Sequence, residues 1–162
     1  MSGQKRLGYW LSRGVLWMNR ALLKSGRDDW ETPQALYDEL DAEFGFTVDA
    51  CATQHNTKCQ RFFSPEQDGL LQDWSGETVW LNPPYSTKLQ DAFVRKAYEA
   101  TRDADTTVVA LLPARTDTKR FHKYILEKAE IRFLPGRITF VGAESAAPFP
   151  SMVVVWRSRG EM

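Results

Sequence analysis

Three short apolar runs constrain the fold of this chain more than any other feature. Residues 78–81, 107–112 and 151–156 are apolar almost without interruption, and none is longer than six residues. Continuous apolar runs of this length are typical of strands buried on both faces, and they are much too short to span a membrane. The segments between them repeat apolar residues with the period of an amphipathic helix. Together these features predict an α/β fold with a mostly parallel sheet between helices.

The first predicted helix follows Thr32 and Pro33. Thr32 suits the N-cap position, and Pro33 suits the first helical position, where its missing N–H costs nothing. Gly45 can end the helix in the left-handed conformation. The face that this helix would bury is formed by Leu36, Tyr37, Leu40 and Phe44. A short strand over residues 46–49 follows.

The second half of the chain predicts two more helices and three more strands. One helix begins near Ser86 or Thr87 and another near Asp117 or Thr118. Their apolar faces consist of Leu89, Phe93, Ala97 and Ala100 in the first, and of Phe121, Ile125 and Ala129 in the second. Residues 131–134 and 137–140 predict two short strands about the Pro135-Gly136 turn, and residues 151–156 the last strand. Since no helix separates these three strands, we expect the sheet to contain an antiparallel strand near the C-terminus.

The size of the chain, 162 residues, fits one domain. Residues 1–27 carry six Lys or Arg and no acid, which predicts a basic N-terminal tail that could be partly disordered, ahead of a domain over residues 28–159. Two cysteines do not make a disulfide framework, and we find no secretory signal. We therefore expect a cytoplasmic protein without a membrane anchor.

The most informative motif is Asn82-Pro83-Pro84-Tyr85, which follows the strand predicted over residues 78–81. The exocyclic amino group of adenine is a poor nucleophile, because its lone pair is delocalised into the ring. The Asn82 side-chain carbonyl and the Pro83 backbone carbonyl could accept its two hydrogens and thereby favour attack on a sulfonium methyl group. Tyr85 could stack on a base that has been flipped out of a duplex. The alternative is a strand-ending turn without chemistry, and amino groups of RNA or of protein glutamine remain other substrates.

Several further motifs in a fixed order resemble the phage and prophage Dam-type DNA N6-adenine methyltransferase family. They span about residues 28–157 and are Asp29-Trp30-Glu31-Thr32-Pro33, Val48-Asp49-Ala50-Cys51-Ala52, Asn82-Pro83-Pro84-Tyr85-Ser86, Leu112-Pro113-Ala114-Arg115-Thr116-Asp117-Thr118, Phe133-Leu134-Pro135-Gly136-Arg137 and Ala147-Pro148-Phe149-Pro150-Ser151-Met152. The resemblance implies a single-domain, reduced Rossmann-like fold and a site-specific enzyme that uses S-adenosyl-L-methionine. It also implies a bacterial or phage-infected host cell.

The resemblance implies a cofactor role for three segments. Trp30, Thr32 and Pro33 would border the methionine end, Asp49 with Ala50, Cys51 and Ala52 would form the first cofactor loop, and Asp73 would meet the cofactor adenine. A carboxylate at position 49 can pair with the α-ammonium of the cofactor. The interval from Asp49 to Asn82 is too short for two further strand–helix units, so the acid that normally holds the ribose lacks a clear counterpart. Glu66 and Asp68 are the candidates.

Duplex DNA is the expected partner, and basic residues near the predicted site are the candidate phosphate contacts. These are Arg115, Lys119, Arg120, Lys123 and Arg137, although a solvated helix face is the alternative for the middle three. We expect no separate target-recognition domain, so loops, the basic tail or a second subunit of a homo-oligomer would read the sequence. Phe149 is expected in the core. A DNA-binding module without catalysis is the remaining alternative function.

Cys51, His55 and Cys59 are spaced by four residues, which on a helix would align them as metal ligands. Structural zinc sites require four ligands, and the chain has no further cysteine. We therefore expect no metal.

Overall fold

The structure is a computed structural model that describes residues 30–103 and 105–158. The predicted basic tail, residues 1–27, lies outside the described residues. One five-stranded sheet forms the centre, in the order β1-β2-β3-β5-β4. Its strands are β1 (Val48–Asp49), β2 (Thr78–Leu81), β3 (Thr107–Pro113), β4 (Glu130–Phe133) and β5 (Ser151–Arg157).

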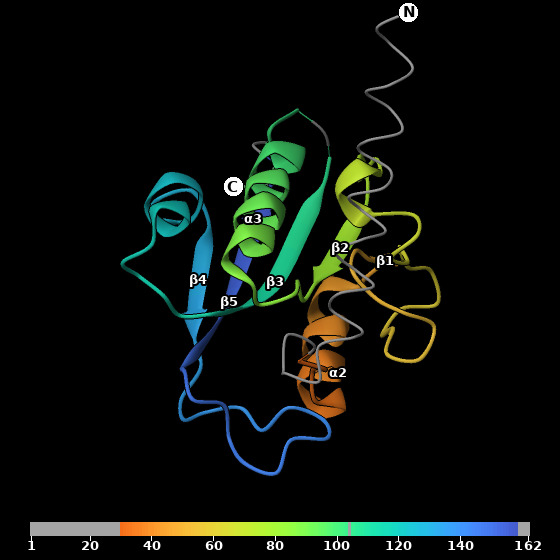
Figure 1. The fold of residues 1–162 in the computed structure, drawn as a ribbon. Coiled ribbons are helices and arrows are strands. Elements are labelled where there is room, and N and C mark those ends of the chain that lie inside the picture. The colour runs from red at the N-terminus through yellow and green to blue at the C-terminus, as the bar shows by residue number, and fades with distance from the viewer. Residues whose placement is uncertain (1–29, 104, 159–162) are drawn as a thin grey trace, which may run out of the picture.

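Helical elements cover both faces of the sheet (Figure 1). They are α2 (Gln34–Phe44), the short η1 (Gly69–Leu71), α3 (Thr87–Asp103) and η2 (Phe121–Ile125), a single turn of π-helix. Successive residues of β3 serve the two faces alternately: Val108 packs with Phe93 of α3, whereas Val109 packs with Tyr37 of α2. Burial on both sides therefore requires the apolar residues that fill β3 from Val108 onward.

The predicted mixture of parallel and antiparallel strands is confirmed. β1, β2 and β3 run parallel, while β5 lies antiparallel to both β3 and β4. The register pairs Leu112 of β3 with Met152, and Met152 with Phe133 of β4. The carboxyl ends of β2, β3 and β4 therefore lie along the same edge of the sheet, which we call the carboxyl edge. Figure 1 shows α2 and the loop after β4 near this edge.

The prediction of a strand over residues 137–140 is wrong, because this segment has no regular secondary structure. The Pro135-Gly136 turn, with Gly136 at φ +70°, does not return the chain alongside β4. It leads the chain to the α2 side of the sheet, where Phe140 is buried and packs 5.1 Å from the Trp30 ring. The apolar pattern reflects burial of Phe140 rather than pairing in the sheet.

The predicted start of the first helix is also wrong in detail. The helix begins at Gln34, Pro33 occupies the N-cap position, and no side chain caps it. The Thr32 hydroxyl instead accepts a hydrogen bond from Asn82. At the other end Gly45 adopts φ +67° and its N–H binds the Asp41 carbonyl, as predicted. Tyr37 and Leu40 of the predicted face are buried.

The helix predicted from Asp117 or Thr118 is much shorter than its periodicity suggests. Thr118 Oγ1 does accept the Phe121 N–H, and both Phe121 and Ile125 are buried. The helical turn ends at Ile125, however, and Glu127 has φ +59°. Ala129 lies beyond the helix, so a third apolar residue at helical spacing does not extend it.

Residues 61–63 form an extended segment that sequence reasoning missed. The Asp49 N–H binds the Arg61 carbonyl at 3.0 Å, and the Phe63 N–H binds the Asp49 carbonyl at 2.9 Å. Phe62 and Asp49 form an isolated parallel β-bridge. It lies on the side of β1 that faces away from β2. The polar interval after β1 therefore adds one more extended stretch to the sheet.

Candidate active site

The direction of the chain after β1 locates the candidate site. From β1 the chain passes to residues 61–63 on one side, and later to β2 on the other side. In open α/β sheets such a reversal leaves a crevice at the carboxyl ends of the two strands, where ligands bind. Asp49 ends β1 and Asn82 follows β2, and both line one small pocket of about 30 Å³. Its other lining residues are Trp30, Glu31, Thr32, Cys51, Asn56, Lys58 and Trp80.

The side-chain amide of Asn82 is held in one orientation. Its Nδ2 donates to the Trp30 carbonyl at 2.5 Å and to Thr32 Oγ1 at 3.0 Å. Because a backbone carbonyl can only accept, the nitrogen must be the atom on that side. Asn82 Oδ1 is buried and has no hydrogen-bond partner among the described residues. A buried acceptor without a donor is costly, so this oxygen is suited to a donor on a bound molecule.

Asp49 is a buried carboxylate held by backbone groups. It is 3% exposed, and it accepts the N–H groups of Cys51 at 3.3 Å and Lys58 at 3.1 Å. Burial raises its pKa to about 6, while these two backbone N–H groups and the Lys58 charge oppose that rise. Within the described residues no Lys or Arg forms an ion pair with it. An acid of this kind gains from a bound cation, which fits the ammonium group of an amino acid.

Sequence reasoning missed an ion pair in this pocket. The Lys58 ammonium lies 3.1 Å from Glu31 Oε1 and 3.2 Å from Gln34 Oε1. Its side chain is only 7% exposed, compared with 33% for Glu31. Lys58 sits in a polar stretch without regular periodicity, so nothing in the sequence distinguishes it from a solvated lysine.

The loop after β1 also borders a second, very small pocket. Ala50, Cys51 and Ala52 line it together with Asp68 and Gly69. Gly69 must lack a side chain, because a Cβ at this position would lie 2.0 Å from the Ala50 carbonyl oxygen. Asp68 caps η1 by accepting the Leu70 N–H at 3.0 Å. Thus η1 packs directly on the loop that carries the predicted cofactor residues.

Asp73 is not brought to this site. It lies ahead of the amino end of β2, whereas Asp49 lies at the carboxyl end of the parallel neighbour. The carboxylate is exposed and accepts hydrogen bonds from Ser75 N and Oγ at 2.9 and 2.6 Å. These bonds lower its pKa. Of the acids after residue 60, Asp68 lines the pocket beside the cofactor loop and exposed Glu66 lines a larger cleft of about 640 Å³.

Tyr85 belongs to a cluster of four aromatic side chains beside Asn82. Its ring centroid lies 5.4 Å from Phe149, 6.0 Å from Phe140 and 6.3 Å from Trp30. The hydroxyl oxygen is buried without a hydrogen-bond partner among the described residues, and burial raises its pKa. Phe149 is half-buried in this cluster rather than part of a closed core. Pro83 is buried and Pro84 is half-buried.

Three of the five predicted phosphate contacts follow strands that end at the carboxyl edge. Arg115 and Lys119 follow β3, Arg137 follows β4, and all three are exposed. Lys123 is exposed as well. Arg120 is not available, because it is 8% exposed and donates to Asp91 at 2.9 Å and Gln90 at 3.0 Å. Arg120 therefore joins α3 to the loop after β3, and the prediction of a DNA contact there is wrong.

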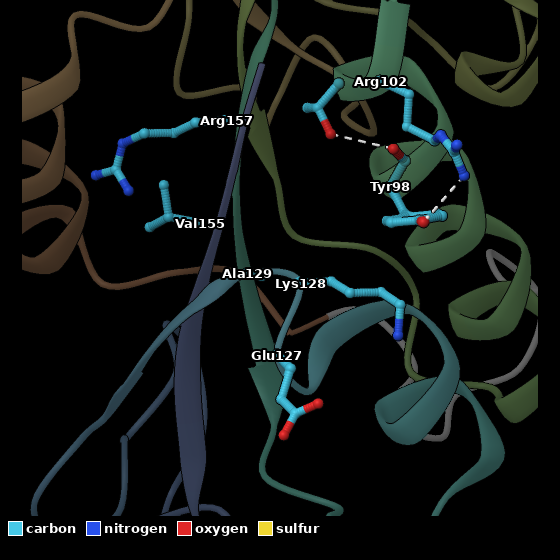
Figure 2. Close-up of a pocket in the computed structure, with 8 residues that line it drawn as sticks. Tyr98, Arg102, Glu127, Lys128, Ala129, Val155 and Arg157 are labelled. Carbon is cyan, nitrogen blue, oxygen red and sulfur yellow. Dashed lines mark hydrogen bonds between the residues drawn. The ribbon is translucent and has the colours of Figure 1, made fainter. Parts of the chain in front are cut away.

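A pocket of about 480 Å³ lies at the opposite edge of the sheet (Figure 2). Arg157, on one wall, pairs with Thr107 at the start of β3, and Tyr98 and Arg102 come from the last turns of α3. Figure 2 shows the Arg102 guanidinium bound to the Tyr98 hydroxyl, at 3.0 Å. None of the sequence motifs reaches this pocket.

Cys59 is buried with its Sγ 3.1 Å from the Tyr37 hydroxyl. In the described ranges no group of three or more His, Cys, Asp or Glu side chains is arranged to hold a metal ion. Nor does any helix there have the length and apolar character needed to cross a membrane.

Comparison with known proteins places this chain in a family. The family model for DNA N-6-adenine-methyltransferase (Dam) matches residues 19–161. A DNA N-6-adenine-methyltransferase of Haemophilus phage HP1 is 38% identical over 125 residues, which cover 75% of this chain and 71% of the relative. One of Escherichia phage T1 is 36% identical over 115 residues, 70% of this chain and 47% of the relative. A putative methyltransferase of Escherichia coli, YfdM, is 33% identical over 70 residues, 39% of this chain and 77% of the relative. The chain therefore belongs to the Dam family of DNA N-6-adenine-methyltransferases.

Proposed function

We propose that this chain transfers a methyl group from S-adenosyl-L-methionine to N6 of an adenine flipped out of duplex DNA, and that Asn82 is the catalytic acceptor. One observation supports this most: the Asn82 amide nitrogen donates both hydrogens, to Trp30 and Thr32, while its buried oxygen has no hydrogen-bond partner among the described residues. The exocyclic amino group of adenine would supply the hydrogen-bond donor that this oxygen lacks.

Asn82 Oδ1 would accept one hydrogen of the adenine amino group, and the Pro83 carbonyl the other. Two acceptors on the amino hydrogens draw the nitrogen out of conjugation with the ring and concentrate its lone pair. The Pro83 ring fixes φ and the following Pro84 restricts the ψ of Pro83, so the Pro83 carbonyl is held rigidly. Asn82 Oδ1 needs no reorientation, because both amide hydrogens are already bound. The chain thus contributes mainly positioning and preorganised dipoles.

The cofactor would supply an electrophilic methyl group on a sulfonium. Asp49 fits its α-ammonium, because this buried carboxylate has no ion pair with a described Lys or Arg side chain. Asp68 and the Ala50–Ala52 loop line the adjoining pocket, which makes Asp68, rather than Asp73, the better candidate for the adenosine part. The order of residues 61–63, β1, β2 and β3 supports a reduced Rossmann-like arrangement, with the ligand at the reversal of strand order.

DNA would approach the carboxyl edge. Arg115, Lys119 and Arg137 are exposed there and fit phosphate groups. The target base must leave the duplex to reach Asn82, and the aromatic cluster with Tyr85 offers ring faces and edges against which it can pack. We place this activity in the bacterial cytoplasm, with a defined target sequence.

The test replaces Asn82 in two ways. Asn82→Ala should reduce methyl transfer to duplex DNA by about 10²–10³-fold, the usual loss for a preorganised polar group at a reacting centre. Asn82→Asp should reduce methyl transfer almost as severely, although a carboxylate is a good hydrogen-bond acceptor. Its second oxygen would face the Trp30 carbonyl at the place where Nδ2 now donates at 2.5 Å.

Transfer of labelled methyl groups to DNA, RNA and protein is measured in parallel, and calorimetry with S-adenosylhomocysteine follows cofactor binding. Retention of a tenth of the wild-type turnover by Asn82→Ala would disprove the assignment. Transfer to RNA or protein but not to DNA would replace the proposed substrate.

A further inference from the structure

The polar pocket between β1 and β2 contains two opposite charges that the sequence does not associate. Asp49 and Lys58 both line it, and both are almost fully buried. The Lys58 backbone N–H binds Asp49 Oδ2 at 3.1 Å, so the loop holds the two residues together. The head group of an amino acid carries one ammonium and one carboxylate on a single carbon. A buried acid beside a buried base matches both of its charges.

Lys58 already forms an ion pair with Glu31, but the two side chains differ in exposure. Its side chain is 7% exposed, whereas that of Glu31 is 33% exposed. If the pair opens, Glu31 can be hydrated where it is, while Lys58 would be left as a buried charge without a partner. Lys58 is therefore the fixed member of the pair, and Glu31 is the member that can be exchanged.

Glu31 also stands between two hollows. It lines the pocket of about 30 Å³ with Asp49 and Asn82, and it also lines the cleft of about 640 Å³ with Asn56 and Glu66. The small pocket has room for roughly one or two water molecules. Movement of the Glu31 carboxylate away from Lys58 would join the two spaces.

We infer that Lys58 binds the α-carboxylate of the cofactor and that this carboxylate displaces Glu31 from the Lys58 ammonium. The inference rests on the proposed use of S-adenosyl-L-methionine. Asp49 and Lys58 together then form a site for the amino-acid head group, and Glu31 is a competitor for that site. This predicts opposite effects for the two members of one ion pair.

The experiment uses three neutral thioethers that share the thioadenosine part. S-adenosylhomocysteine has both charges, decarboxylated S-adenosylhomocysteine has only the ammonium, and 5′-methylthioadenosine has neither. Calorimetry measures each with wild type, Lys58→Met and Glu31→Gln. Lys58→Met should weaken S-adenosylhomocysteine about 10- to 100-fold, the range for losing a hydrogen bond to a charged group. The other two ligands should bind to it as they bind to wild type.

Glu31→Gln should bind S-adenosylhomocysteine at least as tightly as wild type, because the competing charge is gone. If the Glu31–Lys58 pair only braces the loop, both variants weaken all three ligands, and that result would overturn the inference. An unchanged affinity of Lys58→Met for S-adenosylhomocysteine would do the same. Should Lys58→Met not fold, the sign of the Glu31→Gln effect still decides. Failure of wild type to bind any of the ligands would instead contradict the proposed function.

Discussion

At the scale of single residues, the site contains polar groups that have partners among the described residues and polar groups that have none there. The amide nitrogen of Asn82 donates to Trp30 and Thr32, whereas its oxygen has no hydrogen-bond partner in the part of the chain that the structure describes. Asp49 has backbone donors but no ion pair with a described Lys or Arg. The sequence predicted both residues from their motifs. It could not predict that Thr32 orients Asn82, because this contact joins residues fifty positions apart and no local pattern records it.

The raised pKa of Asp49 predicts that stability and cofactor affinity change in opposite directions with pH. Its pKa is about 6 in the folded protein and near 4 in an unfolded chain. The folded state therefore holds this proton more tightly, and the stability that it contributes is lost as pH rises from about 4 to about 6. The difference in unfolding free energy between wild type and Asp49→Asn should fall by roughly 3 kcal/mol over this range.

Cofactor binding should respond in the reverse sense, because the α-ammonium pairs with the ionised carboxylate. The affinity of wild type for S-adenosylhomocysteine should rise about tenfold per pH unit up to pH ~6 and then level off. Denaturant unfolding and calorimetry at matched pH values measure the two quantities. An affinity that does not change between about pH 4.5 and 6.5 would argue against an ionised Asp49 as the cofactor partner.

At the scale of elements, the sequence predicted buried strands well and exposed or irregular segments poorly. β2, β3 and β5 are buried on both faces, so their composition alone reveals them. Residues 137–140 have the same β-branched and aromatic character, but Phe140 is buried against Trp30 instead of in the sheet. Residues 61–63, Arg-Phe-Phe, pair with β1 at the edge of the sheet through one bridge at Phe62, and two apolar residues are too short a run to indicate a strand. Pairing at an edge is decided by tertiary contacts, which composition does not record.

The contact between η1 and the cofactor loop predicts a specific effect of Gly69→Ala. The new Cβ would meet the Ala50 carbonyl oxygen at 2.0 Å, so the loop must move. We expect a loss of about 1–3 kcal/mol in stability, as for overpacked cores, together with weaker binding of S-adenosylhomocysteine. Thermal unfolding and calorimetry measure both effects.

Gly45→Ala is the matched control. Gly45 has φ +67° and open space around its Cβ position, so the substitution should cost about 1–2 kcal/mol through the left-handed backbone alone. Its affinity for S-adenosylhomocysteine should remain that of wild type. Equal affinities of the Gly69 and Gly45 variants would show that the loop after β1 does not contact the cofactor.

At the scale of the whole molecule, the charges are separated although their sum is zero. Residues 28–73 hold eleven acids and two Lys or Arg, while residues 113–159 hold nine Lys or Arg and four acids. Among the described basic residues after residue 113, Arg120, Arg132 and Arg157 are paired with acids, whereas Arg115, Lys119, Lys123, Lys128 and Arg137 form no ion pair with a described residue. Arg115 and Arg137 of this second group follow strands at the carboxyl edge. Binding of DNA should therefore depend on a few local contacts and not on a global field.

A salt titration of duplex binding tests this. With ~3–6 phosphate contacts, the slope of log affinity against log salt should be about −3 to −5. Arg115→Ala and Arg137→Ala should each make it shallower by about one unit without changing cofactor affinity. Lys128→Ala is the control, because this exposed lysine precedes β4 at the opposite edge. A slope near zero, or equal slopes for all variants, would place the DNA surface elsewhere.

The bonds made by the short segment before α2 also bear on when the enzyme becomes active during synthesis. The carbonyl of Trp30 binds the Asn82 side chain, and the carbonyl of Glu31 binds the Val141 N–H at 3.0 Å. Bringing together positions this far apart in sequence requires closing long loops, which is slow and costs entropy. Asn82 therefore cannot be held in its working orientation by the residues nearest to it in the nascent chain. A polypeptide still on the ribosome, with residue 141 not yet released, should be catalytically silent.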